Sequence, residues 1–599
     1  MSETQTEVKN LLKGGEFLVK TSNYIDTFTP EDLNEEQQMI IDTVVSFVEN
    51  EIVPIYDKIE TQEPGVAVSL LEKAGELGLL GLAIPEQYGG MGKDFNTNSL
   101  LVEYMARARS FSLSVGAHIG IGTLPIVYFG NDQQKEYYLP KLATGELKAC
   151  YCLTEPSSGS DALGAKTTAI LNEEGTHYIV NGQKMWITNS GFADVFIVFC
   201  QIDGNKFSCL ILEKDMEGLT LGAEEKKMGI KGSSTRQVFL ENVKVPKENL
   251  LGEIGKGHLI AFNILNIGRY KLAAGVLGAS KMALEQSATY ANERFQFKVP
   301  IASFGAIQYK IAEMATRIYA LQSACYRASD MIDNKEKELV AEGKNYQEAI
   351  MLAAEEYAIE CSLLKFFGSE VLDYCVDENV QIHGGMGYSE ELAAAASYRD
   401  ARINRIFEGT NEINRLLSVD MLVKRAMGKK IDIFTPAMAV QKELMSVPDF
   451  STEENNEPLS AEMKAVQNAK KAILMTAGYA AQKLMKELKN EQEILMNVAD
   501  MLAEVFAMES TILRTQKLIS IKGEPAYETQ IDMTKVFVSD AMERLNLHGK
   551  HALQSFVEGD ELRIMLMGLK RFTKFEIFNT KNARRRIAAK VLEEGKYSF

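Results

Sequence analysis

The sequence has few of the residues that mark secreted, metal-binding or nucleic-acid-binding proteins. Seven cysteines are scattered over 599 residues, and because their number is odd we expect reduced thiols in place of a disulfide framework. Cys150 and Cys152 stand too close together for a zinc knuckle and have no second pair, so we predict small buried residues and no bound metal. With a net charge of −17 the chain is not expected to bind nucleic acid, although a local amide-lined groove can still hold an anionic ligand.

Long apolar runs and nucleotide-binding glycine motifs are also missing. No apolar run reaches the length of about 18 residues that a membrane span needs, so we expect no transmembrane segment. Residues 1–10 are polar and acidic, without an arginine-rich or hydrophobic leader, and we therefore expect a cytoplasmic protein. Because G-x-G-x-x-G does not occur, a Rossmann dinucleotide-binding fold is disfavoured.

The period of the hydrophobic pattern changes twice along the chain. Apolar residues recur with helical spacing from residue 36, alternate as in strands from about residue 149, and return to helical spacing from about residue 261. Helices, then strands, then helices predict an α+β fold of successive layers, because a βαβ sheet would alternate the two. We divide the chain into 1–35 (N-terminal arm), 36–148 (N-terminal helical domain), 149–260 (central β-domain), 261–430 (C-terminal helical domain), 431–460 (linker) and 461–599 (C-terminal helical extension).

Turn signals divide the β-segment into strands. Asn181-Gly182 lies between two alternating runs and predicts the turn of a β-hairpin. Asp203-Gly204-Asn205 predicts a second turn, which would join strands at Val195–Gln201 and Phe207–Leu212. Together these signals indicate a compact all-β segment that ends near Gly257.

Breaks in the second helical part are expected at Pro300, at Asp333–Asn345 and at Gly384–Gly387. The polar, acidic stretch Val447–Pro458 is typical of a linker. Beyond it, the helical spacing predicts a separate bundle-like module with helices at about 461–489, 494–518, 533–547 and 562–575. The basic cluster Arg584–Arg586 near the end is expected to be a solvated helix face.

The stretch Arg405–Arg415 carries the most informative carboxylate of the chain. Glu408 stands between the apolar pair Ile406-Phe407 and a glycine turn, and a carboxylate beside apolar side chains loses water, which raises its pKa toward that of a useful base. Thr410 suits the N-cap of the helix that follows. The alternative is an ordinary surface glutamate in front of a helix. The apolar stripe of that helix would consist of Ile413, Leu416, Leu417 and Met421.

Other segments are weak signals alone and stronger together with Glu408. They combine hydroxyl-rich turns, the only tryptophan of the chain, a guanidinium beside aromatic rings, and a glycine turn that brings backbone amides close to a ligand. Such features suit a polar heteroaromatic ring and phosphates, although each is more often structural. The segments are Tyr151–Asp161, Lys184–Asn189, Asn292–Phe297 and Gln381–Tyr388.

In this order and spacing, these segments and Glu408 resemble the acyl-CoA dehydrogenase family of flavoproteins over about residues 36–425. The helical extension is similar to that of the very-long-chain subgroup. The resemblance implies an N-terminal helical domain, a central β-domain and a C-terminal four-helix domain, with FAD at their junction and across a subunit interface. It also implies α,β-dehydrogenation of long-chain fatty acyl-CoA to trans-2-enoyl-CoA in β-oxidation, with hydride transfer to flavin N5.

The resemblance assigns roles residue by residue. Glu408 is implied as the catalytic base that takes the α-proton. Contacts to FAD are implied for Tyr151, Leu153, Thr154, Gly159, Ser160, Trp186, Ile187, Thr188, Arg294, Gln296, Phe297, Gln381, Gly384, Gly385, Thr410, Asn411 and Glu412. Contacts to the substrate are implied for Ser160, Asn266, Arg269, Phe407 and Gly409. Of the cofactor residues, Arg294, Gln296 and Phe297 would reach the FAD of a neighbouring subunit.

Some positions depart from the family or concern its partners. Lys298 stands where the family usually has glycine, and His383 occupies a variable position that we interpret as packing. Taken by themselves, the small residues of Ser114–Gly122 favour close packing of helices. The resemblance instead implies that this stretch, in which His118 is the one bulky polar residue, forms the end of a deep acyl pocket. Glu225 matches a docking position for an electron-transfer flavoprotein.

The assembly and the exact reaction stay open at this point. The resemblance implies a homodimer or homotetramer, and a peripheral membrane role would have to come from an amphipathic helix or the arginine cluster. An oxidase, or a dehydrogenase for another acyl-CoA, would keep the same fold. A non-catalytic scaffold would have no need for the base, the tryptophan and the neighbouring hydroxyl that this sequence retains.

Overall fold

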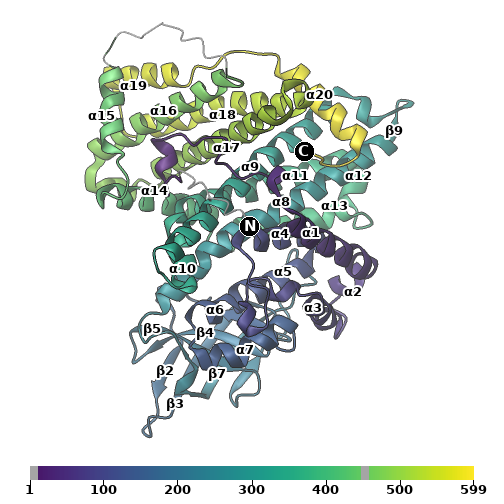
Figure 1. Ribbon diagram of the computed structural model, residues 1–599, viewed down its shortest axis with the longest axis vertical. Helices are drawn as coiled ribbons and strands as arrows, with labels where there is room; N and C mark the ends of the chain where they lie inside the picture. The colour runs from purple at the N-terminus through teal and green to yellow at the C-terminus, as the bar shows by residue number, and fades with distance from the viewer. Residues whose placement is uncertain (1–10, 445, 447–456) are drawn as a thin grey trace, which may run out of the picture.

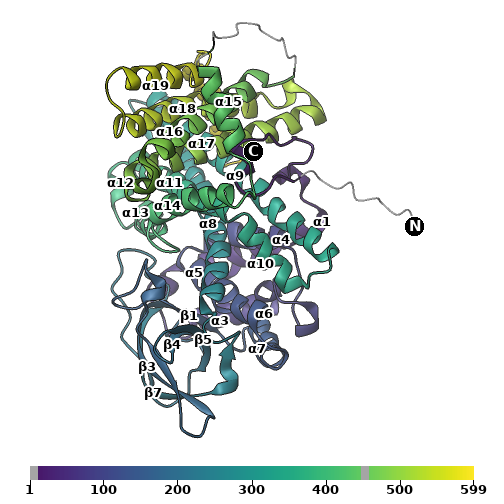
Figure 2. The same ribbon diagram turned by 90° about the vertical axis from the view of Figure 1, so that its left-hand side faces the viewer.

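The computed structural model describes residues 11–444, 446 and 457–599. Its parts follow one another along the longest axis of the molecule (Figure 1). The β-domain lies at one end beside the N-terminal helices, long helices of the C-terminal domain run through the middle, and the helical extension forms the opposite end (Figures 1 and 2). The predicted order of helical, β and helical parts is therefore confirmed.

The N-terminal part is helical, and side-chain caps begin its helices α1, α4 and α7. The first helix begins after Asn34, whose side chain accepts from the Gln37 N–H at 2.8 Å while the Gln37 side chain accepts from the Asn34 N–H at 3.1 Å. The helices are α1 (Glu35–Phe47), α2 (Tyr56–Glu60), α3 (Val66–Glu76), α4 (Phe95–Met105), α5 (Ser110–Gly116), α6 (Leu124–Phe129) and α7 (Asp132–Thr144), with a π-helical segment η8 (Ala117–Gly122) between α5 and α6.

Within the described residues, one stretch is long and apolar enough to cross a membrane, Ser110–Phe129, with a mean hydropathy of 1.4. The prediction that no run reaches this length overlooked it because glycine and serine interrupt its large apolar residues. In the folded chain 78% of its most apolar 18-residue window is buried. It forms part of the protein core, between the N-terminal helices and the β-domain.

The β-domain is built around an eight-stranded sheet with the order β6-β7-β3-β2-β4-β5-β8, in which β1 pairs with β4. The predicted turn at Asp203-Gly204-Asn205 is confirmed, because β4 and β5 pair antiparallel on either side of it. The strands are β1 (Ala149–Cys152), β2 (Thr168–Leu171), β3 (His177–Thr188), β4 (Val195–Ile202), β5 (Lys206–Glu213), β6 (Leu219–Leu221), β7 (Thr235–Pro246) and β8 (Leu250–Leu251).

The predicted hairpin at Asn181-Gly182 is wrong. Both runs belong to the single strand β3, which pairs with β7 along its length and shifts register between Val180 and Gly182. The Asn181 carboxamide oxygen accepts from the backbone N–H of Asn242 on β7 at 2.8 Å. Pairing with neighbours on both sides holds β3 extended, and the Asn-Gly pair is accommodated as a β-bulge in place of a turn.

The C-terminal domain consists of long helices, and one of its predicted breaks is misplaced. The second long helix continues through Asp333 to Ala341. The buried Asp333 carboxylate accepts from the backbone N–H groups of Phe95 at 2.7 Å and Asn96 at 2.9 Å, so it caps the start of α4. The elements are α8 (Gly257–Glu293), β9 (Phe295–Gln296), β10 (Val299–Pro300), α9 (Gly305–Ala341), α10 (Tyr346–Glu356), α11 (Ala358–His383), α12 (Gly385–Tyr388), α13 (Ala393–Ala401) and α14 (Asn411–Met427).

The extension is bundle-like as predicted, but it is not a separate module. Its apolar residues join one continuous core with α8, α9 and α11, and α17 packs against both α9 and α14 (Figure 1). Helix α15 lies in the predicted linker, and most of Val447–Pro458 falls outside the described residues. The helices are α15 (Phe434–Leu444), α16 (Ser460–Leu484), α17 (Gln492–Lys522), α18 (Glu528–Gln554), α19 (Gly559–Phe572) and α20 (Thr580–Glu594).

The described part of the N-terminal arm is clamped against the extension. The Arg514 guanidinium on α17 is fully buried and pairs with Glu31 at 2.5 Å, and the rings of Phe17 and Phe506 lie 5.1 Å apart. The hydrophobic pattern could not predict this contact, because a segment without regular secondary structure has no repeating pattern of apolar residues. The arm therefore joins the first and last parts of the chain into one body.

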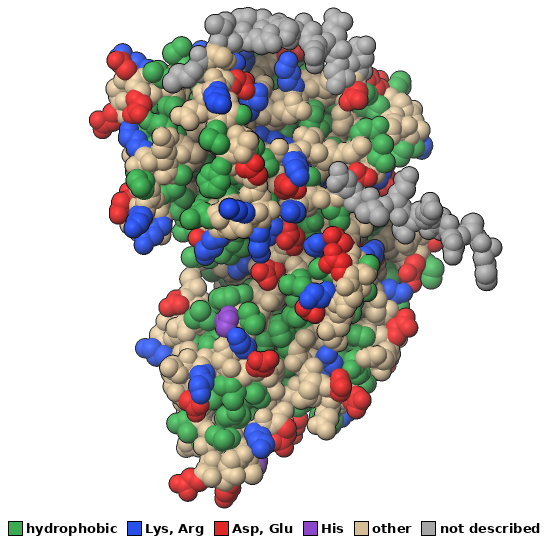
Figure 3. Space-filling model, turned by 60° about the vertical axis from the view of Figure 1, so that its left-hand side comes forward, with side chains coloured by type: hydrophobic (Ala, Val, Ile, Leu, Met, Phe, Trp, Pro, Cys, Tyr) green, Lys and Arg blue, Asp and Glu red, His purple; other side chains and the backbone are tan. Residues whose placement is uncertain are grey.

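The arginine cluster Arg584–Arg586 was predicted to be a solvated helix face, and two of its arginines form ion pairs. Acidic and basic side chains alternate over the face in Figure 3, with no large region of one sign. Arg584 pairs with Glu313 at 2.6 Å and with Asp540, and Arg586 pairs with Asp532 at 2.7 Å. The predicted solvated face is wrong at Arg584, which is buried between α9 and α18.

Candidate active site

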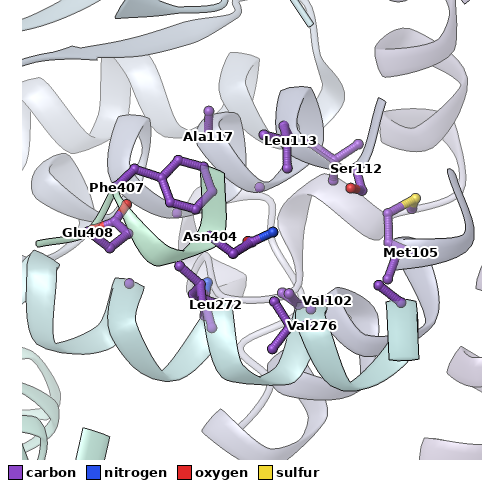
Figure 4. Close-up of a pocket in the computed structure, with 18 of the residues that line it drawn as sticks. Val102, Met105, Ser112, Leu113, Ala117, Leu272, Val276, Asn404, Phe407 and Glu408 are labelled. Carbon is purple, nitrogen blue, oxygen red and sulfur yellow. The ribbon is translucent and has the colours of Figure 1, made fainter. Parts of the chain in front are cut away.

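A cavity of about 230 Å³ lies between the N-terminal helices and α8. Figure 4 shows Glu408 and Phe407 at one end of it, Leu272 and Val276 along α8, and Met105 toward the other end. Apart from a few charged and polar side chains its walls are apolar. The cavity therefore combines a carboxylate with a slot suited to an aliphatic chain.

The small residues of Ser114–Gly122 divide between the two predicted roles. A side chain added at Gly116 or Gly120 would meet nothing within 4 Å, and both glycines line the cavity. At Gly122 an added Cβ would lie 2.8 Å from the Cβ of Ala149, so this glycine is required for packing. His118 does not line the cavity; its imidazole is buried between the Leu142 carbonyl at 2.9 Å and the Ala149 N–H at 3.2 Å.

The loop that carries Glu408 is held in a left-handed backbone conformation. Glu408 has a φ of 57° and Gly409 a φ of 81°. The Asn414 amide donates to the carbonyls of Gly409 at 2.9 Å and Thr410 at 3.0 Å. The predicted N-cap is confirmed, since the Thr410 hydroxyl accepts from the Ile413 N–H at 3.3 Å at the start of α14. The sequence reasoning did not identify the role of Asn414.

Burial raises the pKa of Glu408, although positive charges on Arg269 and Lys365 partly offset the effect. Its Oε2 atom is buried and has no hydrogen-bond partner among the described residues. The predicted source of this desolvation is wrong for Ile406, which is 48% exposed. Shielding comes instead from α8, where an added Cβ on Gly268 would lie 2.9 Å from Oε2.

Two buried cations flank the carboxylate. Arg269 on α8 donates to the side-chain amide oxygen of Asn266 at 2.7 Å, and its Nε has no partner in the described part of the chain. Lys365 on α11 donates to the side chain of Asn411 at 2.9 Å, and burial lowers the pKa of this lysine to about 8. Lys365 was missed, although a lysine inside the apolar run Leu363–Phe367 is a usable signal.

The hydroxyl-rich loop after β1 is anchored by a buried ion pair. Lys184 Nζ lies 2.7 Å from the Glu155 carboxylate, which also accepts from the Thr167 hydroxyl at 2.6 Å. The backbone carbonyl of Thr154 accepts from the Met185 N–H at 2.9 Å and ties the loop to β3. Sequence reasoning missed this ion pair, whose partners lie 29 residues apart.

Models of the acyl-CoA dehydrogenase N-terminal, middle and C-terminal domains match residues 34–146, 150–243 and 255–422. A further model, also described as an acyl-CoA dehydrogenase C-terminal domain, matches residues 468–571 in the extension. The chain belongs to the acyl-CoA dehydrogenase family. The resemblance inferred from the sequence is therefore confirmed.

Similar proteins cover almost the whole chain. A probable acyl-CoA dehydrogenase of Bacillus subtilis (strain 168) is 52% identical over 586 residues, 98% of each chain. The human very long-chain specific acyl-CoA dehydrogenase, mitochondrial, is 33% identical over 88% of this chain and 81% of its own. The crystal structure of an acyl-CoA dehydrogenase complexed with FAD from Bacillus anthracis is 52% identical, with a TM-score of 0.96, and the match covers 98% of this chain and all of that one.

FAD is the cofactor of this acyl-CoA dehydrogenase, and the residues assigned to it fit a flat polar group. The hydroxyl of Tyr151 is buried and has no partner among the described residues. The indole of Trp186 is 53% exposed at a register shift of β3, while Ile187 is buried and Thr188 lines the cavity with Glu408. An added side chain at Gly384 would meet nothing within 4 Å. The unpaired hydroxyl of Tyr151, the exposed indole of Trp186 and the open space beside Gly384 are therefore compatible with such a cofactor.

The remaining predicted cofactor residues differ in their exposure. Gly159 and Ser160 lie exposed on the anchored loop, and Gln381, Gly385 and Glu412 are also exposed. The Asn411 side chain is engaged by Lys365, Ser369 and Glu370, so it secures α14 to α11 and is not free for a ligand. The interpretation of His383 as packing is supported, because its ring stacks on Tyr290 with centroids 4.1 Å apart.

The segment with Arg294, Gln296 and Phe297 forms the exposed hairpin β9–β10 at the edge of the molecule (Figure 1). Phe297 is 89% exposed. Phe297 and Lys298 have φ values of 52° and 68°, so the lysine adopts the left-handed conformation that glycine would favour. The two-residue hairpin turn is thus retained, and the hairpin projects away from the chain that carries it.

Proposed function

We propose that this acyl-CoA dehydrogenase converts long-chain saturated acyl-CoA to trans-2-enoyl-CoA in fatty acid β-oxidation, with Glu408 as the base. The observation that carries the proposal is the unpartnered Glu408 Oε2 at one end of an apolar cavity. A carboxylate without a hydrogen-bond donor is a stronger base than one that is solvated. It is also available to a proton on a ligand that fills the cavity.

The chain's own groups account for the proton transfer. The α-proton of an acyl thioester is too weakly acidic for water to remove at a useful rate, so the base must be desolvated and aligned. Gly268 lets the carboxylate approach α8, and Asn414 holds its loop. Arg269 and Lys365 favour the ionised form of Glu408, because their charges oppose part of the rise in its pKa that burial causes. FAD supplies the acceptor for the hydride that leaves the β-carbon.

The preference for long chains rests on the shape of the cavity. Gly116 and Gly120 leave open space where side chains would shorten it, and Leu113 and Val276 continue its apolar wall. A straight saturated chain gains from burial in proportion to its length, by about 0.8 kcal/mol per methylene. The proposal therefore predicts that kcat/KM rises with acyl length until the cavity is filled.

Replacing Glu408 with glutamine tests the base. Because glutamine keeps the shape and removes the proton acceptor, we expect FAD to stay bound and dehydrogenation to fall by about 10²–10⁴-fold. The measurement is anaerobic bleaching of the flavin absorbance by acyl-CoAs from short to very long. Glu173→Gln, in the exposed turn between β2 and β3, is the matched control and should behave as wild type. Retained bleaching by Glu408→Gln would eliminate Glu408 as the base.

Partners and assembly form a second part of the proposal. We propose that reduced enzyme is reoxidised by an electron-transfer flavoprotein that docks near Glu225, whose carboxylate is held by the Gln237 amide at 3.0 Å beside the exposed Met228. Turnover with and without such an acceptor separates it from oxygen-dependent oxidase activity. The projecting Phe297 supports a homodimer in which this hairpin reaches the partner's cofactor. A cytoplasmic location stays a prediction.

A further inference from the structure

Lys271 is a buried cation in the wall of the acyl cavity. It lies on α8 one turn after Gly268, on the face that lines the cavity, and it is only 9% exposed. Leu272, the next residue, lies between Glu408 and Val276 in Figure 4, so this part of α8 follows the cavity away from the base. Among the described residues no hydrogen bond and no charged neighbour acts on this side chain.

The other charged groups of the cavity are already engaged or have an assigned role. The Arg109 guanidinium stacks over the ring of Tyr56 at 5.3 Å. Burial raises the pKa of the Asp400 carboxyl to about 6, and the positive charge of Arg109 partly offsets that rise. Asp400 accepts a hydrogen bond from the backbone N–H of Ile230. Glu408 is the proposed base. Lys271 alone among the described cavity-lining charges has no neighbouring group to compensate it.

A charge in this position has a physical cost. Burial lowers the pKa of Lys271 to about 8, and no charged neighbour contributes. Near neutral pH the side chain therefore remains mostly an ammonium group inside an apolar slot. An unpaired buried ammonium is destabilising, whereas methionine or leucine would line the same slot without this cost. An anionic group on the ligand would compensate the charge.

On the basis of the proposed function, we propose that Lys271 is a specificity-determining residue that pairs with a carboxylate at the distal end of the acyl chain. The enzyme would then accept ω-carboxyacyl-CoA esters, the thioesters of dicarboxylic acids. Their methylenes pack on the apolar walls and their terminal carboxylate reaches the ammonium group. The reaction is unchanged, since Glu408 still takes the α-proton and the hydride still leaves the β-carbon.

Three matched substrate series test the proposal on the wild-type holoenzyme: chains that end in a methyl group, a carboxylate, or the methyl ester of that carboxylate. The ester removes the charge of the end group and adds one methyl group to it. At the chain length that reaches Lys271, we expect kcat/KM for the carboxylate to exceed that for the ester by about tenfold or more. Equal values for carboxylate and ester at every length would overturn the proposal.

Two variants assign the effect to the ammonium group. Lys271→Met keeps an unbranched side chain of similar length, and it should abolish the preference for carboxylate over ester. Leu272→Met changes the shape of the neighbouring wall without changing charge, and it should keep that preference. If Lys271→Met retained the preference, Lys271 would not be the recognising group. Flavin content and thermal unfolding of each variant establish that it is folded.

The outcomes separate this proposal from the proposed function. Turnover of methyl-ended chains without any carboxylate preference would sustain the function and remove the role of Lys271. If no acyl-CoA were dehydrogenated, the proposed function would fail, and ligand dissociation constants from flavin spectral shifts would then decide whether Lys271 binds carboxylates. If Lys271→Met failed to fold, the comparison of carboxylate with ester on the wild-type enzyme would still decide.

Discussion

Replacing Gly268 with alanine would place a methyl group against the carboxylate of Glu408. The added Cβ would lie 2.9 Å from Oε2, 3.2 Å from Cδ and 3.5 Å from Oε1, whereas ordinary van der Waals contact begins at 3.4 Å. Oε2 must therefore move by about 0.5 Å, and a misplacement of about 1 Å can cost 10²-fold in rate. We expect kcat to fall about tenfold. Stability should not fall, because alanine is favoured over glycine inside a helix by about 0.5–1 kcal/mol.

The assay is single-turnover flavin reduction under anaerobic conditions, combined with thermal unfolding of the same preparation. Gly275→Ala is the matched control, because it makes the same change on the same face of α8 but its Cβ meets only the Val102 side chain at 3.5 Å. With a short acyl chain the control should reduce flavin far faster than Gly268→Ala. Unchanged reduction by Gly268→Ala, or a large loss of thermal stability, would refute the assigned contact with Glu408.

Two further predictions concern charge. Burial raises the pKa of Glu408, so on acidification the active ionised base should be lost at a higher pH than that at which an exposed glutamate titrates. Below the raised pKa of Glu408, kcat/KM should fall tenfold per pH unit. A fall only in the pH range of an ordinary glutamate would contradict the assignment. Lys184→Met should destabilise the holoenzyme by about 3–5 kcal/mol in denaturant unfolding, because it leaves the buried Glu155 without its cation. The control Lys206→Met breaks the exposed pair with Asp203 and should cost less than about 1 kcal/mol. Equal losses of stability in the two variants would show that burial of the Lys184–Glu155 pair is energetically irrelevant.

Features that depend on near neighbours in the chain were predictable. The antiparallel strands around Asp203-Gly204-Asn205 and the helix capped by Thr410 both follow from residues within one turn or one strand pair. The order of helical and β parts could also be predicted from the sequence, because the spacing of apolar residues indicates which face of each helix or strand is buried. The turn at Lys298, where the family usually has glycine, still forms, since the backbone of a lysine can adopt the left-handed conformation at modest cost.

Features that depend on distant partners were not predictable. Asn181-Gly182 is a strong turn signal, yet pairing of β3 with strands on both sides overrides it. Asp333 is a plausible helix break, yet its carboxylate caps a helix more than 200 residues earlier. The extension was expected to be a separate module because no local pattern reveals that its apolar faces cover α9 and α14.

The same division holds for the active site. By itself the sequence determined the family, the cofactor and the candidate base, because a carboxylate, a tryptophan and glycine turns in a fixed order are visible without coordinates. Only the tertiary structure decided how that base is shielded, because Ile406 beside it faces solvent while Gly268, Arg269 and Lys365 come from helices elsewhere in the chain. A pKa responds to what surrounds a group in space, and adjacency in sequence does not fix that environment.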